Sequence, residues 1–130
     1  MKRRACPIAL HPDGSTRRIA FCQHPQNELI AGDFGIDERA DAMAARLLFA
    51  QCGLETRAAL SIGTLNDAEH DIEWHFALCR IVPPIREQWQ HLHAADTALL
   101  KFTWLPLDAP FPEGISNADV QALNWIKSNL

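Results

Sequence analysis

An acid and two arginines draw attention in the first half of this 130-residue chain, because their spacing could serve a chemical purpose. Arg39 and Arg46 would lie on the same side of a helix, close to the acid Glu38. Two guanidinium groups on one side could contact an anionic ligand, since arginine binds phosphate and carboxylate groups in a bidentate manner. The alternative is that both arginines are ordinary solvated helix charges.

These residues belong to a longer pattern that runs from Gly32 to Leu54. Its fixed positions are Gly32, then Glu38 after five residues, Arg46 after seven more, and finally Leu48, Gly53 and Leu54. The pattern resembles the Nudix box, a loop–helix–loop signature that reads Gly, Glu, Arg-Glu, an aliphatic residue, Glu-Glu, Gly and an aliphatic residue. The resemblance fails at three positions, where the family has glutamates and this chain has Leu47, Ala50 and Gln51.

The resemblance implies a hydrolase of nucleoside diphosphates linked to another group, with box glutamates that bind magnesium or manganese. Such cations neutralise diphosphate oxygens and lower the pKa of a bound water. Positions 47, 50 and 51 of a helix share one face, and here that face is apolar with one amide. We therefore expect a Nudix-like protein with impaired or lost hydrolysis, no metal cofactor at the box, and Glu38 as the surviving box acid.

Acids elsewhere leave open an active hydrolase that takes Mg²⁺ or Mn²⁺ ligands from outside the box. Asp71, Glu73 and His75 alternate along an expected strand and would share a face. The plain alternative is that they form the solvent side of an amphipathic strand. The loop acids Asp33 and Asp37 are the other candidates for such ligands.

Trp89 is the one tryptophan of the four that falls in a segment without clear periodicity. The other three lie on expected strands or on a helix, where packing explains them. A ring in an irregular segment could stack on a nucleobase. We therefore name Trp89, Arg39 and Arg46 as candidate binding residues for a nucleotide-like or phosphorylated small molecule.

The hydrophobic pattern predicts both helices and strands. A helix is expected over residues 38–52, capped by Asp37 and ended by Gly53, and Ser116 would open a C-terminal helix. The segment 85–95 is expected to be a loop with a short helical turn. Strands are expected at residues 5–10, 18–23, 58–65, 71–82 and 99–104, with the first two forming a hairpin.

This order of elements matches the α/β/α sandwich with a mixed sheet that Nudix domains form, as a single domain over residues 1–130. The helix over residues 38–52 is apolar on most sides. We therefore expect it to be buried on more than one side or to contact another protein, such as a second copy of the chain in a homodimer.

Composition narrows the partners and the compartment. A net charge of −4 argues against a nucleic-acid polymer as partner, since such a partner favours a basic chain. No apolar segment approaches the length of a membrane span. The four cysteines are widely spaced without a zinc pattern, which favours buried free thiols and a reduced, cytoplasmic location.

Overall fold

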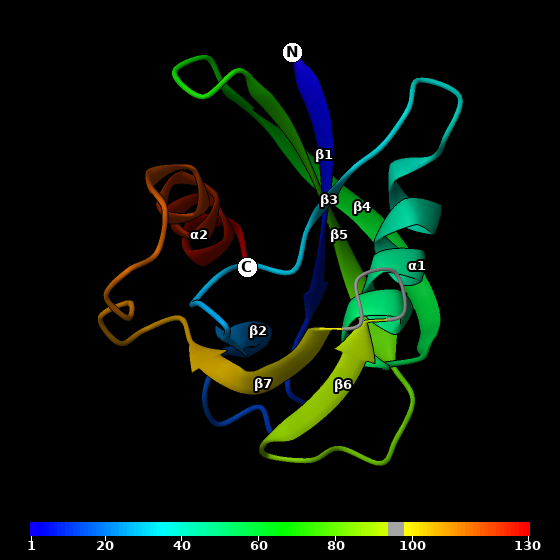
Figure 1. The fold of residues 1–130 in the computed structure, drawn as a ribbon, viewed down its shortest axis with the longest axis vertical. Coiled ribbons are helices and arrows are strands. Elements are labelled where there is room, and N and C mark those ends of the chain that lie inside the picture. The colour runs from blue at the N-terminus through cyan, green and yellow to red at the C-terminus, as the bar shows by residue number, and fades with distance from the viewer. Residues whose placement is uncertain (94–97) are drawn as a thin grey trace.

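The computed structural model describes residues 1–93 and 98–130, and it contains two β-sheets and two long helices (Figure 1). The elements in chain order are β1 (Lys2–Ala9), β2 (Arg18–His24), β3 (Gly32–Asp33), α1 (Ala40–Cys52), β4 (Thr56–Asp67), β5 (Ile72–Ile81), β6 (Trp89–His93), β7 (Ala98–Pro106) and α2 (Asn117–Asn129). The first sheet has the order β3-β1-β5-β4 and the second has the order β2-β7-β6. Because β1 runs parallel to β5 and antiparallel to β3, the first sheet is mixed. The predicted α/β fold with a mixed sheet is confirmed.

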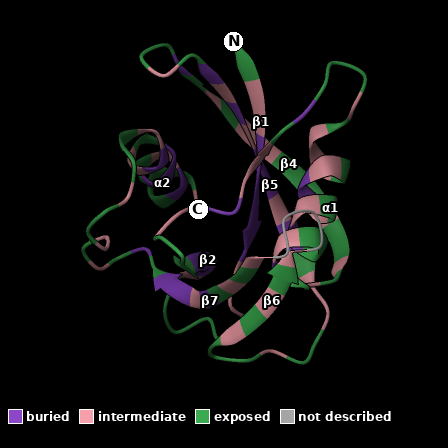
Figure 2. Cartoon of the chain, in the orientation of Figure 1, coloured by how far each residue is buried: buried purple, intermediate pink, exposed green. Residues whose placement is uncertain are grey.

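Two apolar clusters lie on opposite faces of the first sheet, and each is covered by one helix. Alternate residues of β5 serve the two faces: Trp74 and Phe76 belong to the cluster under α2, whereas Ala77 and Cys79 belong to the cluster under α1. Trp125 of α2 stacks on Phe76, with ring centroids 4.2 Å apart. Figure 2 shows buried residues concentrated where the sheets and helices meet.

Helix α1 begins at Ala40, two residues later than expected, and Asp37 does not cap it. Arg39 is the N-cap residue and makes no side-chain capping bond, while Asp37 lies exposed in the preceding turn. Gly53 ends the helix as predicted, with a φ of 74° and a backbone N–H that donates to the Phe49 carbonyl at 2.9 Å. A left-handed residue at this position favours glycine.

The expectation that α1 is buried on more than one side is wrong. A helix resting on a sheet contacts it along one stripe, and the buried residues of α1 are Ala44, Leu48 and Cys52. Other apolar positions face solvent, and Phe49 is 56% exposed. The apolar character of α1 therefore leaves an uncovered surface.

The first two strands do not form the expected hairpin. Strand β1 lies between β3 and β5, whereas β2 pairs with β7 in the other sheet. An isolated bridge between Leu10 and Ile19 joins the two segments. Strand β1 is buried on both faces from Ala5 to Ala9, which suits a central strand with a neighbour on each side.

The expected loop over residues 85–95 is also wrong in part, because Trp89–His93 forms β6 and residues 94 and 95 lie outside the described residues. The inward positions of β6 hold a tryptophan and two histidines. Because histidine is not hydrophobic, the alternation of inward and outward residues does not show as an alternation of apolar and polar residues. At the C-terminal helix the prediction is confirmed: the Ser116 hydroxyl accepts the Asp119 N–H at 3.2 Å. The Asp119 carboxylate accepts the Leu29 N–H at 3.0 Å.

The predicted state of the cysteines is confirmed, because Cys6, Cys22, Cys52 and Cys79 are all free and buried. Within residues 1–93 and 98–130, neither helix has the length and apolar character needed to cross a membrane.

Candidate functional site

In the box segment, residues 32–54, two of the three positions where the Nudix box has glutamates serve packing. A β-carbon placed on Gly32 would come within 2.6 Å of Leu47 Cδ2, so the leucine side chain fills the space above the glycine. Gln51 Nε2 donates to the Ala31 carbonyl at 3.1 Å. Ala50 is exposed to solvent. Leu47 and Gln51 thereby hold α1 against β3 and its approach.

These positions do not fit a hard divalent cation. Magnesium and manganese take several oxygen ligands, with carboxylates prominent among them. Leu47 and Ala50 offer no side-chain oxygen, and Gln51 offers one neutral oxygen on an amide already engaged with the backbone. The loop acid Asp33 accepts from Arg4 Nε at 3.0 Å. No metal-dependent step is therefore assigned to the box.

Both box arginines are paired with carboxylates. Arg46 Nη2 donates to Glu38 Oε2 at 3.1 Å, and Glu38 Oε1 accepts the Gly35 N–H at 3.1 Å. Arg39 Nη2 donates to Asp41 Oδ2 at 2.8 Å. An anion that binds either arginine must therefore compete with a neighbouring acid. Because both arginines are largely exposed, these pairs contribute little to stability.

The structure brings together two of the three acidic or imidazole residues expected on β5. His75 Nε2 lies 3.1 Å from Glu73 Oε1, and the His75 ring meets the Phe34 ring edge-on at 5.2 Å. Asp71 instead lies in the turn before β5 with a φ of 56°, and its carboxylate pairs with the amino group of Met1 at 3.6 Å. Two ligands remain where three were expected.

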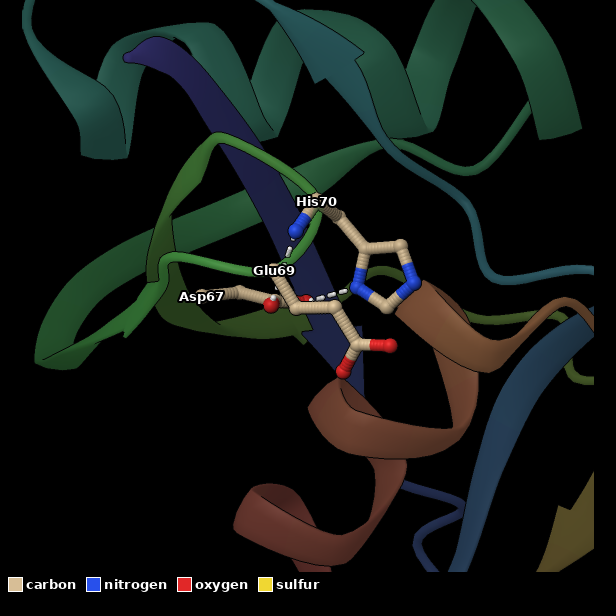
Figure 3. Close-up of side chains that lie close together, drawn as sticks. All are labelled: Asp67, Glu69 and His70. Atoms are coloured by element: carbon tan, nitrogen blue, oxygen red, sulfur yellow. Dashed lines mark hydrogen bonds and ion pairs between the residues drawn. The ribbon is translucent and has the colours of Figure 1, made fainter.

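A different cluster, missed by the sequence analysis, gathers in the turn between β4 and β5 (Figure 3). Asp67, Glu69 and His70 place potential ligand atoms within 4.8 Å of one another. The buried Asp67 carboxylate binds the His70 ring at 2.7 Å and accepts the His70 N–H at 3.2 Å. These bonds give the cluster a structural role, because they hold the two ends of the turn together. Its signal in the sequence was the close spacing of two acids and a histidine just before β5.

A cavity of about 370 Å³ opens at the C-terminal end of α1 and includes Trp89 in its lining. Trp89 Nε1 donates to the Cys52 carbonyl at 3.0 Å, which fixes the indole at the end of the helix. The Trp89 ring lies 5.3 Å from that of Trp104, centroid to centroid. His91 lines the same cavity and packs on Gly53. Of the predicted ligand-binding residues, Trp89 is thus the one placed in this cavity, which we call the helix-end cavity.

Arg86 also lines the helix-end cavity, and the sequence analysis missed it. Its guanidinium has no hydrogen-bond or ion-pair partner within residues 1–93 and 98–130. Its backbone carbonyl accepts from Trp104 Nε1 at 2.7 Å, which anchors the chain at this residue. In the sequence, Arg86 is marked only by its position between Pro83-Pro84 and Trp89. The loop expected over residues 85–95 gave no reason to choose Arg86 as a binding residue.

The three predicted ligand-binding residues do not form one site. Arg39 precedes the first residue of α1, and Trp89 lies at the opposite end of this 13-residue helix. At 1.5 Å per residue the helix is about 20 Å long. Arg39 lines a separate cavity of about 320 Å³ between α1 and β4.

Known proteins share the fold but not the sequence of this chain. No protein-family model matches it, and no curated protein resembles it in sequence. The solved structure of MutT from Aliivibrio salmonicida and Vibrio cholerae aligns over 99% of this chain and 98% of its own, with a TM-score of 0.65 and 13% identity. An ADP-ribose pyrophosphatase from Streptococcus suis aligns over 99% and 92%, with a TM-score of 0.66 and 16% identity. The NUDIX domain of Shewanella oneidensis NrtR, complexed with ADP ribose, aligns over 98% and 87%, with a TM-score of 0.65 and 12% identity. The chain therefore has the Nudix fold.

Proposed function

We propose that this protein binds a nucleotide-like or other phosphorylated small molecule and has lost, or nearly lost, pyrophosphate hydrolysis. The observation that carries the proposal is the packing of Leu47 on Gly32 and of Gln51 on Ala31, at positions where the Nudix box has glutamates. Without carboxylate ligands, the box cannot hold the cations that neutralise a diphosphate during attack by water. One structural neighbour is an ADP-ribose pyrophosphatase and another is complexed with ADP ribose, which makes ADP-ribose the first ligand to test.

The helix-end cavity is the site that we propose for this ligand. Trp89 offers an aromatic surface for a base, and Arg86, whose guanidinium has no partner among residues 1–93 and 98–130, offers a cation for a phosphate group. His91 adds a polar group on the same lining. Arg39 and Arg46 remain the alternative cations, but a ligand there must displace an acid from each.

Calorimetry with ADP-ribose tests the proposal, first in the presence of a chelator and then with Mg²⁺ or Mn²⁺. We expect binding without metal, no change in Kd when metal is added, and no release of AMP. Arg86→Gln should weaken binding by roughly tenfold, because it removes a charge-assisted bond to phosphate. Arg46→Gln is the matched control and should leave the Kd unchanged. Metal-dependent turnover would contradict the proposal and support a hydrolase with ligands outside the box, such as Glu73.

A reversion of the box gives a second test. The triple variant Leu47→Glu, Ala50→Glu and Gln51→Glu restores the carboxylate cluster of the Nudix box. We expect it to release AMP from ADP-ribose in the presence of Mg²⁺. Circular dichroism must first show that the variant is folded, since Leu47 is part of the packing. Inactivity of a folded variant would mean that the cleft itself has diverged from that of Nudix hydrolases.

One observation favours a second function, the formation of a homodimer. Phe49 on α1 is 56% exposed, and Leu92 and Leu99 are 55% and 50% exposed. The two leucines lie directly opposite each other on β6 and β7. Exposed apolar side chains that gather on a surface mark contact sites. Sedimentation velocity over a range of concentrations tests this function, and Phe49→Asp should abolish any dimer formed through α1.

A further inference from the structure

A larger cavity, of about 650 Å³, lies where the adjoining parts of β4 and β5 meet the segment after β1. We call it the strand-edge cavity, and its lining is mostly apolar, with Leu10, Leu60 and Leu78 among its large side chains. Leu60 and Leu78 are paired across β4 and β5, so they share one face of the sheet. Leu60 is 66% exposed, which leaves apolar surface at the rim uncovered. The volume is that of a typical small-molecule site.

The histidine in this lining is already engaged. His11 Nδ1 accepts the Asp13 N–H at 3.0 Å, and His11 Nε2 lies 3.3 Å from Glu87 Oε1. The two acids are themselves compensated by Arg18, which lies 3.1 Å from Glu87 and 3.6 Å from Asp13. This side of the strand-edge cavity therefore offers little unsatisfied charge to a ligand.

Arg80 is the charged residue of the lining that remains available. It is exposed, and it makes no hydrogen bond or ion pair with the described residues, 1–93 and 98–130. Because it follows Leu78 by two positions on β5, it lies on the same face of the sheet as Leu78 and Leu60. An apolar hollow is thus joined to one positive charge that has no partner in the part of the chain that the structure describes.

We propose that the strand-edge cavity binds a small amphipathic anion. The apolar body lies against Leu60 and Leu78, and the carboxylate, phosphate or sulfonate group pairs with Arg80. Burial of the body removes apolar surface from water, while the single cation favours an anion over a neutral or cationic molecule of equal size. This inference goes beyond the function proposed for the helix-end cavity, because it concerns a different arginine and a ligand without a nucleotide.

Dodecanoate, used below its critical micelle concentration, is the probe, and calorimetry and displacement of a fluorescent naphthalene sulfonate are the measurements. We expect a Kd of about 10–100 µM. Shortening the chain to decanoate and octanoate should weaken binding roughly fourfold per methylene, as burial of the chain requires. Decanol should bind more weakly than decanoate, and decyltrimethylammonium more weakly still.

Substitutions separate the two halves of the site. Arg80→Gln should weaken dodecanoate binding about fivefold and leave decanol unchanged, because it removes an exposed charge and no apolar surface. Arg57→Gln is the matched control: Arg57 is an exposed arginine on β4 that lines the cavity beside α1 instead. Ala58→Phe fills the strand-edge cavity from an exposed position and should abolish binding of both probes.

Three results would overturn the inference. The first is absence of dodecanoate binding to the folded wild-type protein. The second is an equal loss of affinity in Arg80→Gln and Arg57→Gln, which would mean a nonspecific attraction of anions. The third is a dimer that Leu60→Asp dissociates, because the cavity would then be covered by a second copy of the chain. Arg86→Gln should leave dodecanoate binding intact, so failure here is distinguishable from failure of the proposed function.

Discussion

The box face of α1 and the helix-end cavity differ in what their polar groups do. On the box face two of the three positions where the Nudix box has glutamates serve packing, with Leu47 against Gly32 and Gln51 bound to Ala31, while Ala50 is exposed. In the helix-end cavity the aromatic ring of Trp89 is fixed by the helix end, while the guanidinium of Arg86 has no partner within the described residues. The polar groups of the box face therefore serve structure. In the helix-end cavity the guanidinium of Arg86 is available to a ligand, as far as the described residues show.

The difference teaches that residues matching a catalytic motif can each have a structural reason to be present. Gly32 leaves room for the close approach of Leu47, and Gly53 is favoured by its left-handed conformation at the end of α1. Glu38 and Arg46 pair with each other. Each retained box residue therefore has a structural reason to be present, and its presence is no evidence of catalysis.

The strongest way to break this comparison is Leu47→Glu as a single substitution. If Leu47 is a packing residue, the variant should lose about 2–4 kcal/mol of unfolding free energy, because a carboxylate replaces a leucine against Gly32. Urea unfolding measures this loss. Ala50→Glu is the matched control on the same face, and its exposure predicts a change within about 0.5 kcal/mol. Equal stability of the two variants would mean that the box face is open and able to accept charge.

Gly53→Ala tests the other region. The φ of 74° disfavours any side chain, and the added β-carbon would come within 2.7 Å of His91 Nδ1. We expect a loss of about 1–2 kcal/mol in urea unfolding. Adding His91→Ala should recover the part due to the clash and leave the part due to backbone strain. If Gly53→Ala is as stable as the wild type, the end of α1 is looser than the structure shows.

The outcome of the sequence analysis follows the same division between packing and chemistry. Capping residues predicted the end of α1 and the cap at Ser116, because each depends on local backbone chemistry. The fold class was predicted from the order of elements together with the resemblance to the Nudix family. The expected hairpin failed, since strand partners are chosen by long-range packing that alternation does not encode. Strand β6 was missed because its inward residues include His91 and His93.

The candidate site was less predictable than the fold. Trp89 was named because its segment lacked clear periodicity, although the structure places it at the start of β6 in the lining of a cavity. Arg86 became visible only when the structure showed which arginines are paired. No spacing rule distinguishes a paired arginine from an unpaired one, because ion pairs depend on side chains brought together by the fold. The cytoplasmic location, the ligand and the loss of catalysis stay predictions.

One side-chain hydrogen bond in each region tests the comparison between the box face and the helix-end cavity, with a smaller expected effect on stability. Trp89→Phe keeps an aromatic ring but removes the donor to the Cys52 carbonyl, and Gln51→Met removes the donor to the Ala31 carbonyl. Each should cost about 1 kcal/mol in urea unfolding. Of the two, Trp89→Phe should also weaken ADP-ribose binding in calorimetry. Weaker binding in Gln51→Met would place the ligand on the box face instead.

The smallest expected effect concerns the thiol beneath the helix-end cavity. Burial raises the pKa of Cys52 well above its ordinary value, and burial raises the pKa of Cys22 and of Cys79 to about 11. A raised thiol pKa means less thiolate at a given pH, and the thiolate is the reactive form. At pH 8 the thiolate fraction of Cys22 and Cys79 is therefore about a hundredfold below that of an exposed cysteine. The thiolate fraction of Cys52 is also lower than that of an exposed cysteine.

Alkylation of the native protein by iodoacetamide should accordingly be slow at pH 8. The rate should rise about tenfold per pH unit between pH 8 and pH 10, without the plateau near pH 9 that exposed thiols give. In urea all four cysteines should react at the ordinary rate, which is the control for reagent and pH. Fast modification assigned by mass spectrometry to Cys52 alone would have a definite meaning. It would show that the helix-end cavity gives solvent access to Cys52, the last residue of α1. The ligand proposed for this cavity would then contact the end of the helix as well as Trp89 and Arg86.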